Sequence, residues 1–220
     1  MRTQEMYIYG FGGISLELAE IMTSRGGNVS GFVVDSQYLT ESIKRNTTNI
    51  PVISFDDLAN HSGNNGITAA ISLGEPFHRE KLSLRLESCG IDESGMNFAQ
   101  YVSSYSSVGK GSILHIGSVV SSGCSVGKSC IINKNSIIGH DSAIGDYSVI
   151  CPCVNIGGHV SIGRRSFVGI GASIRDRVKI GDNVIIGIGA VVTKDIESGY
   201  VAYGNPARII RRNDTFRVFR

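Results

Sequence analysis

Aliphatic residues recur at every sixth position along a long stretch of the chain, from Tyr101 to Ile196. Divided into sixes from Tyr101, this stretch gives sixteen hexads in unbroken register, and the second place of each hexad is Val, Leu or Ile. The sixth place is nearly always small, and Gly most often follows the aliphatic residue. Such a sustained short period indicates a repeat array.

A period of six fits neither an α-helix nor a simple β-strand. It predicts a chain that makes a short extended side, turns a corner and repeats, with the aliphatic residue pointing inward and the small residue beside it. Gly is expected at the turns, where positive φ is needed. Stacked coils would pair their backbones about 4.8 Å apart and cover one another's apolar faces. The pattern therefore predicts a β-solenoid.

Before the repeat, apolar runs alternate with helix-like stretches. Strands are predicted at 6–10, 29–34, 50–53 and 67–73, and helices after Gly13, at 55–59 and at 78–88. Ser54 suits the N-cap of the second helix, and Gly90 suits a left-handed C-terminal residue after the third. Residues 1–95 are therefore predicted to form a small parallel α/β domain, Rossmann-like in type.

A glycine cluster follows the first predicted strand, at Gly10, Gly12 and Gly13. Backbone N–H groups and the helix dipole at such a strand–helix junction favour an anion such as a nucleotide phosphate. Asp35 ends the second strand, from which a carboxylate can reach a sugar hydroxyl or a base edge. Ser15 stands where a further Gly is expected, so a tight turn without a ligand remains an alternative. The α/β region is too short for a complete dinucleotide-binding oxidoreductase fold.

Composition narrows the class of protein further. The chain of 220 residues has 28 Gly, no Trp and a net charge of only +2, which does not favour nucleic-acid binding. No apolar run reaches the ~18 residues of a membrane span, and no signal-peptide pattern opens the chain, so we expect a cytoplasmic protein without a membrane partner.

Five cysteines are present, an odd number that argues against a disulfide framework. Cys124 and Cys130 occupy the small sixth place and are expected to fill the core. Cys151 and Cys153 lack companions at zinc-site spacing, so no metal site is predicted.

The repeat resembles that of the hexapeptide acyltransferases. Their fold implies a left-handed parallel β-helix of triangular section with three hexads per coil, so residues 18 apart should stack in about five coils. The resemblance also implies a homotrimer. Residues 96–212 are accordingly expected to form the β-helix, with a tail at 213–220.

The whole chain resembles the bacterial sugar O-/N-acyltransferases of the sialic acid O-acetyltransferase type, which include N-acetyltransferases acting on UDP-linked 4-amino sugars. The motifs that carry this resemblance are YIYGFGG near the start, GEP at 74–76, IIGHDSAIGD in the repeat and GNPARII at 204–210. Members often carry GAGGHG at the first motif, whereas this chain has Ile14-Ser15 in place of the His-Gly pair. The resemblance implies a substrate site in the first half of the chain, with candidate residues Gly12, Gly13, Ile14, Asp35 and Gly74.

The candidate chemistry lies in the repeat. Attack of a sugar amine or hydroxyl on a thioester needs a base, and His titrates near neutral pH. The resemblance implies that His140 is this base and that Asp141 tunes it. Adding 18 to Asp141 gives His159, which should lie one coil further on the same side; His159 is interpreted as a solvated corner residue, with a substrate or CoA contact as the alternative. The N–H of Gly158 is a candidate donor to the oxyanion.

Acetyl-CoA, the implied co-substrate, would lie in a groove between neighbouring β-helices. The matching residues are Ile170 and Ile188, with Gly171 and Gly189 leaving room for pantetheine. A family histidine that approaches the acetyl group aligns here with Val149.

These observations predict an acetyl-CoA-dependent N-acetyltransferase for a nucleotide-linked amino sugar, serving surface glycan synthesis. Two alternatives remain open at this point. One is an O-acetyltransferase acting on sialic acid or another sugar, and the other is a non-catalytic trimeric binding module.

Overall fold

The computed structural model describes residues 5–44, 48–61, 66–215 and 217–218. The chain divides into two compact units. The first contains Met1–Leu73 and Lys81–Ser94, and the second contains Gly74–Glu80 and Gly95–Arg220. The predicted domain boundary at residue 95 stays a prediction. Within the described residues, no helix combines the length and the apolar character needed to cross a bilayer.

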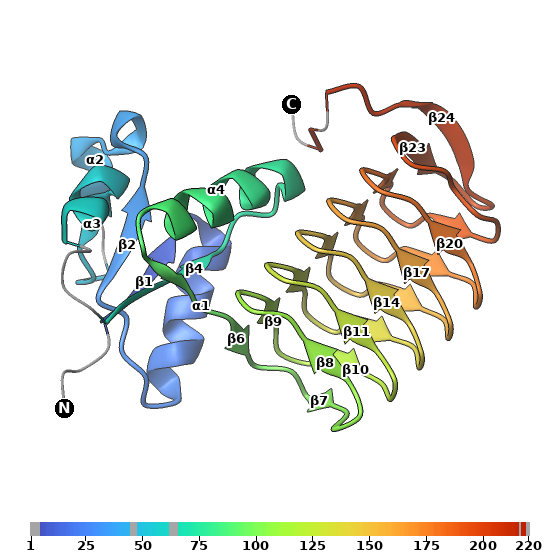
Figure 1. Cartoon of the computed structure of the whole chain (residues 1–220), viewed down its shortest axis with the longest axis horizontal. Coiled ribbons are helices and arrows are strands. Elements are labelled where there is room, and N and C mark those ends of the chain that lie inside the picture. The colour runs from blue at the N-terminus through green and yellow to red at the C-terminus, as the bar shows by residue number, and fades with distance from the viewer. Residues whose placement is uncertain (1–4, 45–47, 62–65, 216, 219–220) are drawn as a thin grey trace. The chain divides into compact units, whose positions relative to one another are not determined.

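The first unit is built on a parallel sheet with strand order β3-β2-β1-β4-β5. Its strands are β1 (Glu5–Tyr9), β2 (Gly31–Val34), β3 (Val52–Ser54), β4 (Ile67–Ile71) and β5 (Asp92–Glu93). Its helical segments are α1 (Gly13–Ser24), the 3₁₀ turn η1 (Ser36–Tyr38), α2 (Glu41–Lys44), α3 (Phe55–His61) and the later part of α4 (Pro76–Ser88) (Figure 1). The predicted alternation of strands and helices is confirmed, and β5 is an addition too short to give a sequence signal.

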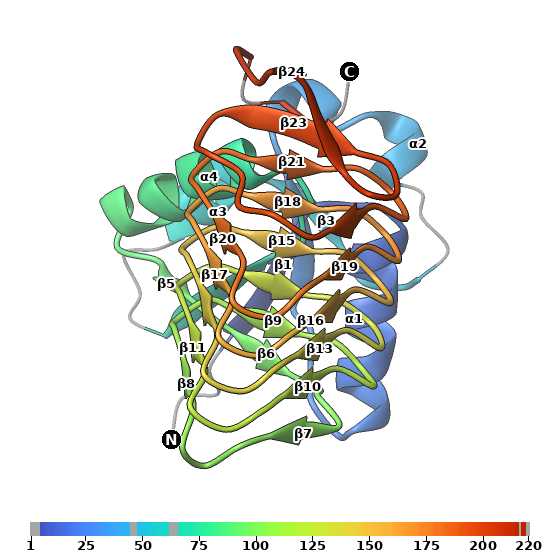
Figure 2. The ribbon, with the colours of Figure 1, turned by 90° about the vertical axis from the view of Figure 1, so that its right-hand side faces the viewer.

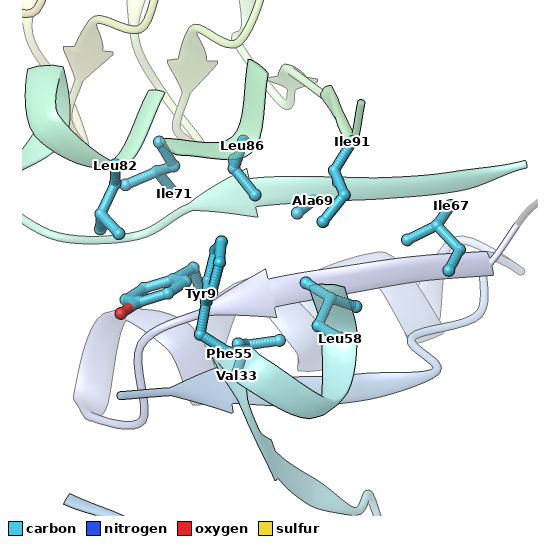
Figure 3. Packing of buried hydrophobic residues seen from close by; sticks show 10 residues of the cluster. All are labelled: Tyr9, Val33, Phe55, Leu58, Ile67, Ala69, Ile71, Leu82, Leu86 and Ile91. Atoms are coloured by element: carbon cyan, nitrogen blue, oxygen red, sulfur yellow. The ribbon is translucent and has the colours of Figure 1, made fainter. Parts of the chain in front are cut away.

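Local signals set the ends of these helices. The N–H of Asp57 donates to Ser54 Oγ at 3.0 Å, and the N–H of Ser54 donates to Asp57 Oδ2 at 3.2 Å, so the predicted N-cap forms a reciprocal capping box. Gly90 follows α4 with φ +68°, as predicted. The core between the sheet and its helices is aliphatic and aromatic (Figure 3). Its buried members are Tyr9, Val33, Phe55, Leu58, Ile67, Ala69, Ile71, Leu82, Leu86 and Ile91.

The second unit is a coil of short strands in three sheets that are parallel apart from an antiparallel pair at the C-terminal end, the arrangement of a left-handed β-helix (Figures 1 and 2). The first sheet contains β7 (Tyr101–Val102), β10 (Val119–Val120), β13 (Ile137–Ile138), β16 (Asn155–Ile156), β19 (Ser173–Ile174) and β22 (Val191–Val192). The second contains β8 (Ser107–Val108), β11 (Ser125–Val126), β14 (Ala143–Ile144), β17 (Ser161–Ile162) and β20 (Lys179–Ile180). The third contains β6 (Met96–Asn97), β9 (Ile113–Leu114), β12 (Ile131–Ile132), β15 (Val149–Ile150), β18 (Phe167–Val168), β21 (Ile185–Ile186), β23 (Tyr200–Tyr203) and β24 (Arg208–Arg212).

The predicted register of 18 residues is confirmed. Ile138, for example, pairs with Val120 on one side and Ile156 on the other. The aliphatic second place is buried in every coil from Leu114 onward, whereas Val108 in the first coil is 38% exposed because no earlier coil covers it. The repeat therefore specifies both the inward face and the stacking of the coils.

The predicted role of the repeat glycines is wrong in one respect. Positive φ falls at the fifth place of every hexad from Gly111 to Gly189, and most of these residues are not Gly. The glycines after the aliphatic residue have another function: a Cβ on Gly139 would lie 2.5 Å from the carbonyl carbon of Gly157 in the next coil. These glycines are needed for close approach of backbones, whereas Asn, Asp and other residues accept the left-handed turn.

The sixth place is polar as well as small in many hexads. Ser142 Oγ donates to the carbonyl of Gly157 at 3.0 Å and accepts from the N–H of Val160 at 3.1 Å. Ser112, Ser148 and Ser166 repeat this pattern at their own corners. A buried serine thus satisfies backbone groups of the next coil that would otherwise be costly to bury. Cys124 and Cys130 take the same place, buried and free, as predicted.

The segment Gly74–Glu80 is anchored within the second unit. Arg79 is fully buried and its Nε donates to the carbonyl of Ser129 at 2.8 Å. Glu80 binds Arg164 and Arg165, and the carboxylate of Glu75 accepts from the N–H of Val218 at 3.0 Å. The segment expected to be a tail, 213–220, extends beyond the described residues at 216, 219 and 220; within it, Asn213 and Val218 are hydrogen-bonded.

Candidate active site

His140 and Asp141 lie in the turn between β13 and β14, at a corner of the β-helix. We call residues 139–142 and 157–160, which form successive turns of this corner, the histidine corner. The N–H of Asp141 donates to the carbonyl of Ser122 at 2.9 Å, and the N–H of His159 donates to the carbonyl of His140 at 2.8 Å. These bonds fix the backbone of neighbouring coils, so the side chains of the corner project from a rigid frame.

His140 and Asp141 form a hydrogen-bonded pair, with Nδ1 and Oδ2 2.8 Å apart. The hydrogen bond from His140 lowers the pKa of Asp141, and the imidazoles of His159 and His140 contribute further in the same direction. The carboxyl group is therefore ionised at neutral pH and can only accept. It follows that Nδ1 of neutral His140 carries the proton, which leaves the lone pair on Nε2.

Gly158 lies against the other edge of the His140 ring. A Cβ on Gly158 would lie 2.6 Å from His140 Nε2. Within the described residues, the N–H groups of its neighbours Gly157 and His159 donate to backbone carbonyls, whereas the N–H of Gly158 donates to no backbone group. The absence of a side chain thus lets Nε2 of His140 approach the backbone of the next coil.

His159 joins the pair from that next coil, as its spacing predicted. Its Nε2 lies 3.9 Å from Asp141 Oδ2, and its ring meets that of His140 edge to face with centroids 4.9 Å apart. One ligand atom from each of His140, Asp141 and His159 lies within 4.8 Å of the others, so these three residues could hold a metal ion.

The residues predicted to contact acetyl-CoA lie at a different corner. Ile170 and Ile188 belong to the turns that follow β18 and β21, and they are 49% and 75% exposed. A Cβ on Gly171 or Gly189 would meet no atom within 4 Å. We call residues 169–172 and 187–190 the isoleucine corner, and it presents an exposed apolar surface. It lies at a different corner of the β-helix from the histidine corner of the same chain. Val149, aligned with a family histidine, is buried in β15.

The glycine cluster of the first unit has the geometry of a strand–helix junction. Gly10 has φ +116°, Gly12 caps α1 in an extended conformation, and a Cβ on Gly12 or Gly13 would meet no atom within 4 Å. Ile14, in the first turn of α1, is partly exposed. The backbone at the N-terminus of α1 is therefore accessible to a ligand at Gly12 and Gly13.

Ser15 has a structural role that the sequence did not predict. It is buried, and its Oγ lies 2.7 Å from Ser72 Oγ, which also donates to the carbonyl of Tyr9 at 2.7 Å. Asp35 is likewise engaged, because it accepts from Arg85, whose guanidinium stacks on Phe55 at 3.6 Å. Gly74 belongs to the second unit, so the substrate candidates do not all fall in one unit.

Comparisons with known proteins identify the repeat and the fold. Residues 159–194 match the bacterial transferase hexapeptide family (six repeats). No curated protein sequence matches the chain. A solved structure of PerB from Caulobacter crescentus in complex with CoA and GDP-perosamine is 25% identical and has a TM-score of 0.84, over 94% of this chain and 97% of PerB.

Two further structures cover the same share of this chain. WeeI from Acinetobacter baumannii is 26% identical with a TM-score of 0.79 and is covered completely. The acetyltransferase domain of PglB from Neisseria gonorrhoeae, in complex with acetyl coenzyme A, is also covered completely; it is 24% identical with a TM-score of 0.81, a likeness of fold. By its repeat at residues 159–194 and by a fold that is similar over 94% of its length, the chain matches the bacterial sugar acyltransferases of the hexapeptide family.

Proposed function

We propose that the protein transfers an acetyl group from acetyl-CoA to the amino group of a nucleotide-linked amino sugar. The observation that carries this proposal is the pairing of His140 with Asp141 at an exposed corner of the β-helix, 2.8 Å apart. A carboxylate that holds Nδ1 leaves Nε2 as a proton acceptor, which is what an amine nucleophile requires. The likeness to PerB, solved with CoA and GDP-perosamine, supports the same chemistry.

In the proposed reaction, the sugar amine attacks the thioester carbonyl carbon while Nε2 of His140 accepts a proton from the amine. The resulting imidazolium is stabilised by the adjacent carboxylate of Asp141. The N–H of Gly158 is the proposed donor to the oxyanion of the tetrahedral intermediate. When the carbon–sulfur bond breaks, the thiolate of CoA takes the proton from His140, and the amide product and free CoA leave.

Acetyl-CoA is proposed to lie along the isoleucine corner. Ile170 and Ile188 offer exposed apolar contacts, and Gly171 and Gly189 leave space beside them for the pantetheine chain. Because one chain carries the histidine corner and the isoleucine corner at different edges of its triangular section, a complete site requires a second copy. A homotrimer meets this requirement, and sedimentation should give three times the 23.5 kDa of one chain.

The first unit is proposed to be a Rossmann-like domain that holds the nucleotide. The accessible N-terminus of α1, at Gly12, Gly13 and Ile14, suits the diphosphate. Asp35 and Arg85 would contact the sugar or base from the ends of the neighbouring elements. Ser15, in the place of a family glycine, supports the strand–helix junction.

Release of CoA from acetyl-CoA tests the proposal when it is measured against UDP-4-amino sugars, GDP- and dTDP-linked amino sugars, CMP-sialic acid and free sialic acid. We expect turnover with one nucleotide-linked amine and a loss of about 10²–10⁴-fold in His140→Ala. His61→Ala is a matched control, since His61 is an exposed histidine of α3. Turnover only with a hydroxyl acceptor would move the assignment to O-acetylation. No CoA release with any substrate of the panel, together with no binding of acetyl-CoA, would favour the non-catalytic binding module.

A further inference from the structure

We propose that His140, Asp141 and His159 form a chelating site for a divalent transition-metal ion of the Zn²⁺ type, and that the bound ion blocks acetyl transfer. The three side chains offer two imidazole nitrogens and one carboxylate oxygen, all within 4.8 Å of one another. Imidazole and carboxylate are ligands that Zn²⁺ prefers, and three protein ligands leave a position for water.

The distances suit insertion of an ion between the existing partners. His140 Nδ1 lies 2.8 Å from Asp141 Oδ2, and His159 Nε2 lies 3.9 Å from the same oxygen. Ligand atoms about 2.0–2.2 Å from a common tetrahedral centre lie roughly 3.3–3.6 Å apart. The His140 side chain would have to move slightly away from Asp141 Oδ2, and the His159 side chain would have to move slightly closer to it. All three side chains are at least 43% exposed, so both movements are open to them.

The backbone holds the ligands in place before an ion arrives. Asp141 and His159 occupy equivalent left-handed turn positions, with φ of 56° and 58°, one coil apart. His159 also donates its N–H to the carbonyl of His140. The 18-residue register, rather than a flexible loop, therefore fixes the backbones that carry the two imidazoles relative to one another, which lowers the entropy cost of chelation.

The next turn of this corner carries three exposed charged residues, Arg175, Asp176 and Arg177. Arg177 occupies the following left-handed position, and its Nε lies 3.9 Å from the carboxylate of Asp176. Asp176 therefore offsets part of the positive charge of the two arginines. Asp141 supplies a carboxylate at the site itself, in contact with His140 and close to His159.

Metal binding would change the tautomer of His140. An ion on Nδ1 takes the lone pair there, so the neutral imidazole must carry its single proton on Nε2. Nε2 could then no longer accept a proton from the amine. This inhibitory part rests on the proposed function, whereas binding of the ion does not.

Isothermal titration of the full chain, dialysed against a chelator and then titrated with Zn²⁺, tests the binding. Visible spectra with Co²⁺ provide a second readout of coordination. We expect one ion per chain and an affinity at least ~10-fold lower in His159→Gln and Asp141→Asn. His78→Gln, an exposed histidine of α4, should bind like the wild type. No stoichiometric binding, or equal affinity in His159→Gln, would overturn the site.

The inhibitory part is tested by acetyl transfer with and without Zn²⁺, each variant compared with its own metal-free rate. We expect the wild type to lose turnover and regain it with a chelator, and His159→Gln to need at least ~10-fold more Zn²⁺. Stoichiometric binding with unchanged turnover would overturn the inhibition. A chain without acetyltransferase activity would overturn the proposed function, and the titration would still decide the site.

Discussion

At the residue scale, the geometry of the histidine corner depends on the absence of a side chain at Gly158. Its missing side chain makes room for the imidazole of His140, and a Cβ there would lie 2.6 Å from Nε2 and 2.7 Å from Cε1. The side chain of His140 is 60% exposed, so it can move away from such a Cβ at little cost to the fold. The geometry of the proposed base is therefore more sensitive to this position than the stability of the protein is.

Gly158→Ala should consequently separate activity from stability. We expect kcat/KM to fall by about 10²-fold, because a small displacement of a catalytic group has an effect of that size. The melting temperature should change by no more than a few degrees. Ser104→Ala, at the same place of an earlier coil and exposed, is the matched control. An active Gly158→Ala protein would show that Nε2 does not act where we place it.

Asp141→Asn removes the charge that holds His140 in its tautomer. We expect kcat to fall by about 10-fold or more with little change in stability, since the carboxyl is exposed. Because the pKa of Asp141 is lowered by its hydrogen bond to His140, this carboxyl stays ionised to a lower pH than a free Asp and cannot cause a loss of activity between about pH 5 and 8. A pH–rate profile of both proteins checks this, and a loss of activity in that pH range that is present in the wild type and absent from Asp141→Asn would contradict it.

At the element scale, successive side chains of each two-residue strand point to opposite faces, and from β10 onward the strands of the first and second sheets bury their second place more than their first. In β9, β12, β15 and β18 of the third sheet both places are buried. β13 gives a matched pair, because Ile138 is fully buried and Ile137 is 43% exposed. The inward residue lies between Val120 and Ile156 of the adjacent coils. Most of the stability of a coil should therefore come from its second place.

Ile138→Ala should lower the free energy of unfolding by about 2–5 kcal/mol, since it opens a cavity between coils. Ile137→Ala should cost less than about 1 kcal/mol. Urea denaturation followed by circular dichroism measures both. An equal cost for the two substitutions would mean that the outward face of β13 is also covered, as it would be by another subunit.

At the scale of the whole molecule, the proposed ligands contact different parts of the chain. Each ligand should raise the melting temperature separately, and a ligand at 100 times its dissociation constant stabilises the folded state by about 2.7 kcal/mol. Gly12→Val places a side chain where no atom lies within 4 Å, so it should block a nucleoside diphosphate without disturbing the fold.

Thermal shifts with UDP or GDP and with acetyl-CoA test this separation. Gly12→Val should abolish the rise in melting temperature caused by the nucleotide and keep the rise caused by acetyl-CoA. Ile188→Asp should abolish the rise caused by acetyl-CoA and keep that caused by the nucleotide, because it places a charge on the apolar surface of the isoleucine corner. Loss of both shifts in either variant would contradict two separate sites.

The hexad pattern by itself determined a β-solenoid and its inward face, because an aliphatic residue at every sixth place points inward when the chain makes a short extended side, turns and repeats. The three hexads per coil, and with them the 18-residue register, came from the resemblance to the hexapeptide acyltransferases. The same register predicted that Asp141 and His159 would meet. Local signals such as Ser54 and Gly90 likewise determined helix ends, since their partners lie within a few residues.

Tertiary structure alone decided the rest. The hexad register does not report side-chain orientation, so it did not predict that Gly158 approaches the His140 ring. Contacts between residues whose separation follows no period were not predicted either, as for Arg79 with Ser129 and Asp35 with Arg85. The left-handed turn at the fifth place was also hidden, because Asp, Asn, His and Arg occupy it beside Gly and the surrounding coils hold them there. A periodic sequence determines the structural features that repeat in every coil. Contacts that occur only once depend on how the folded chain packs.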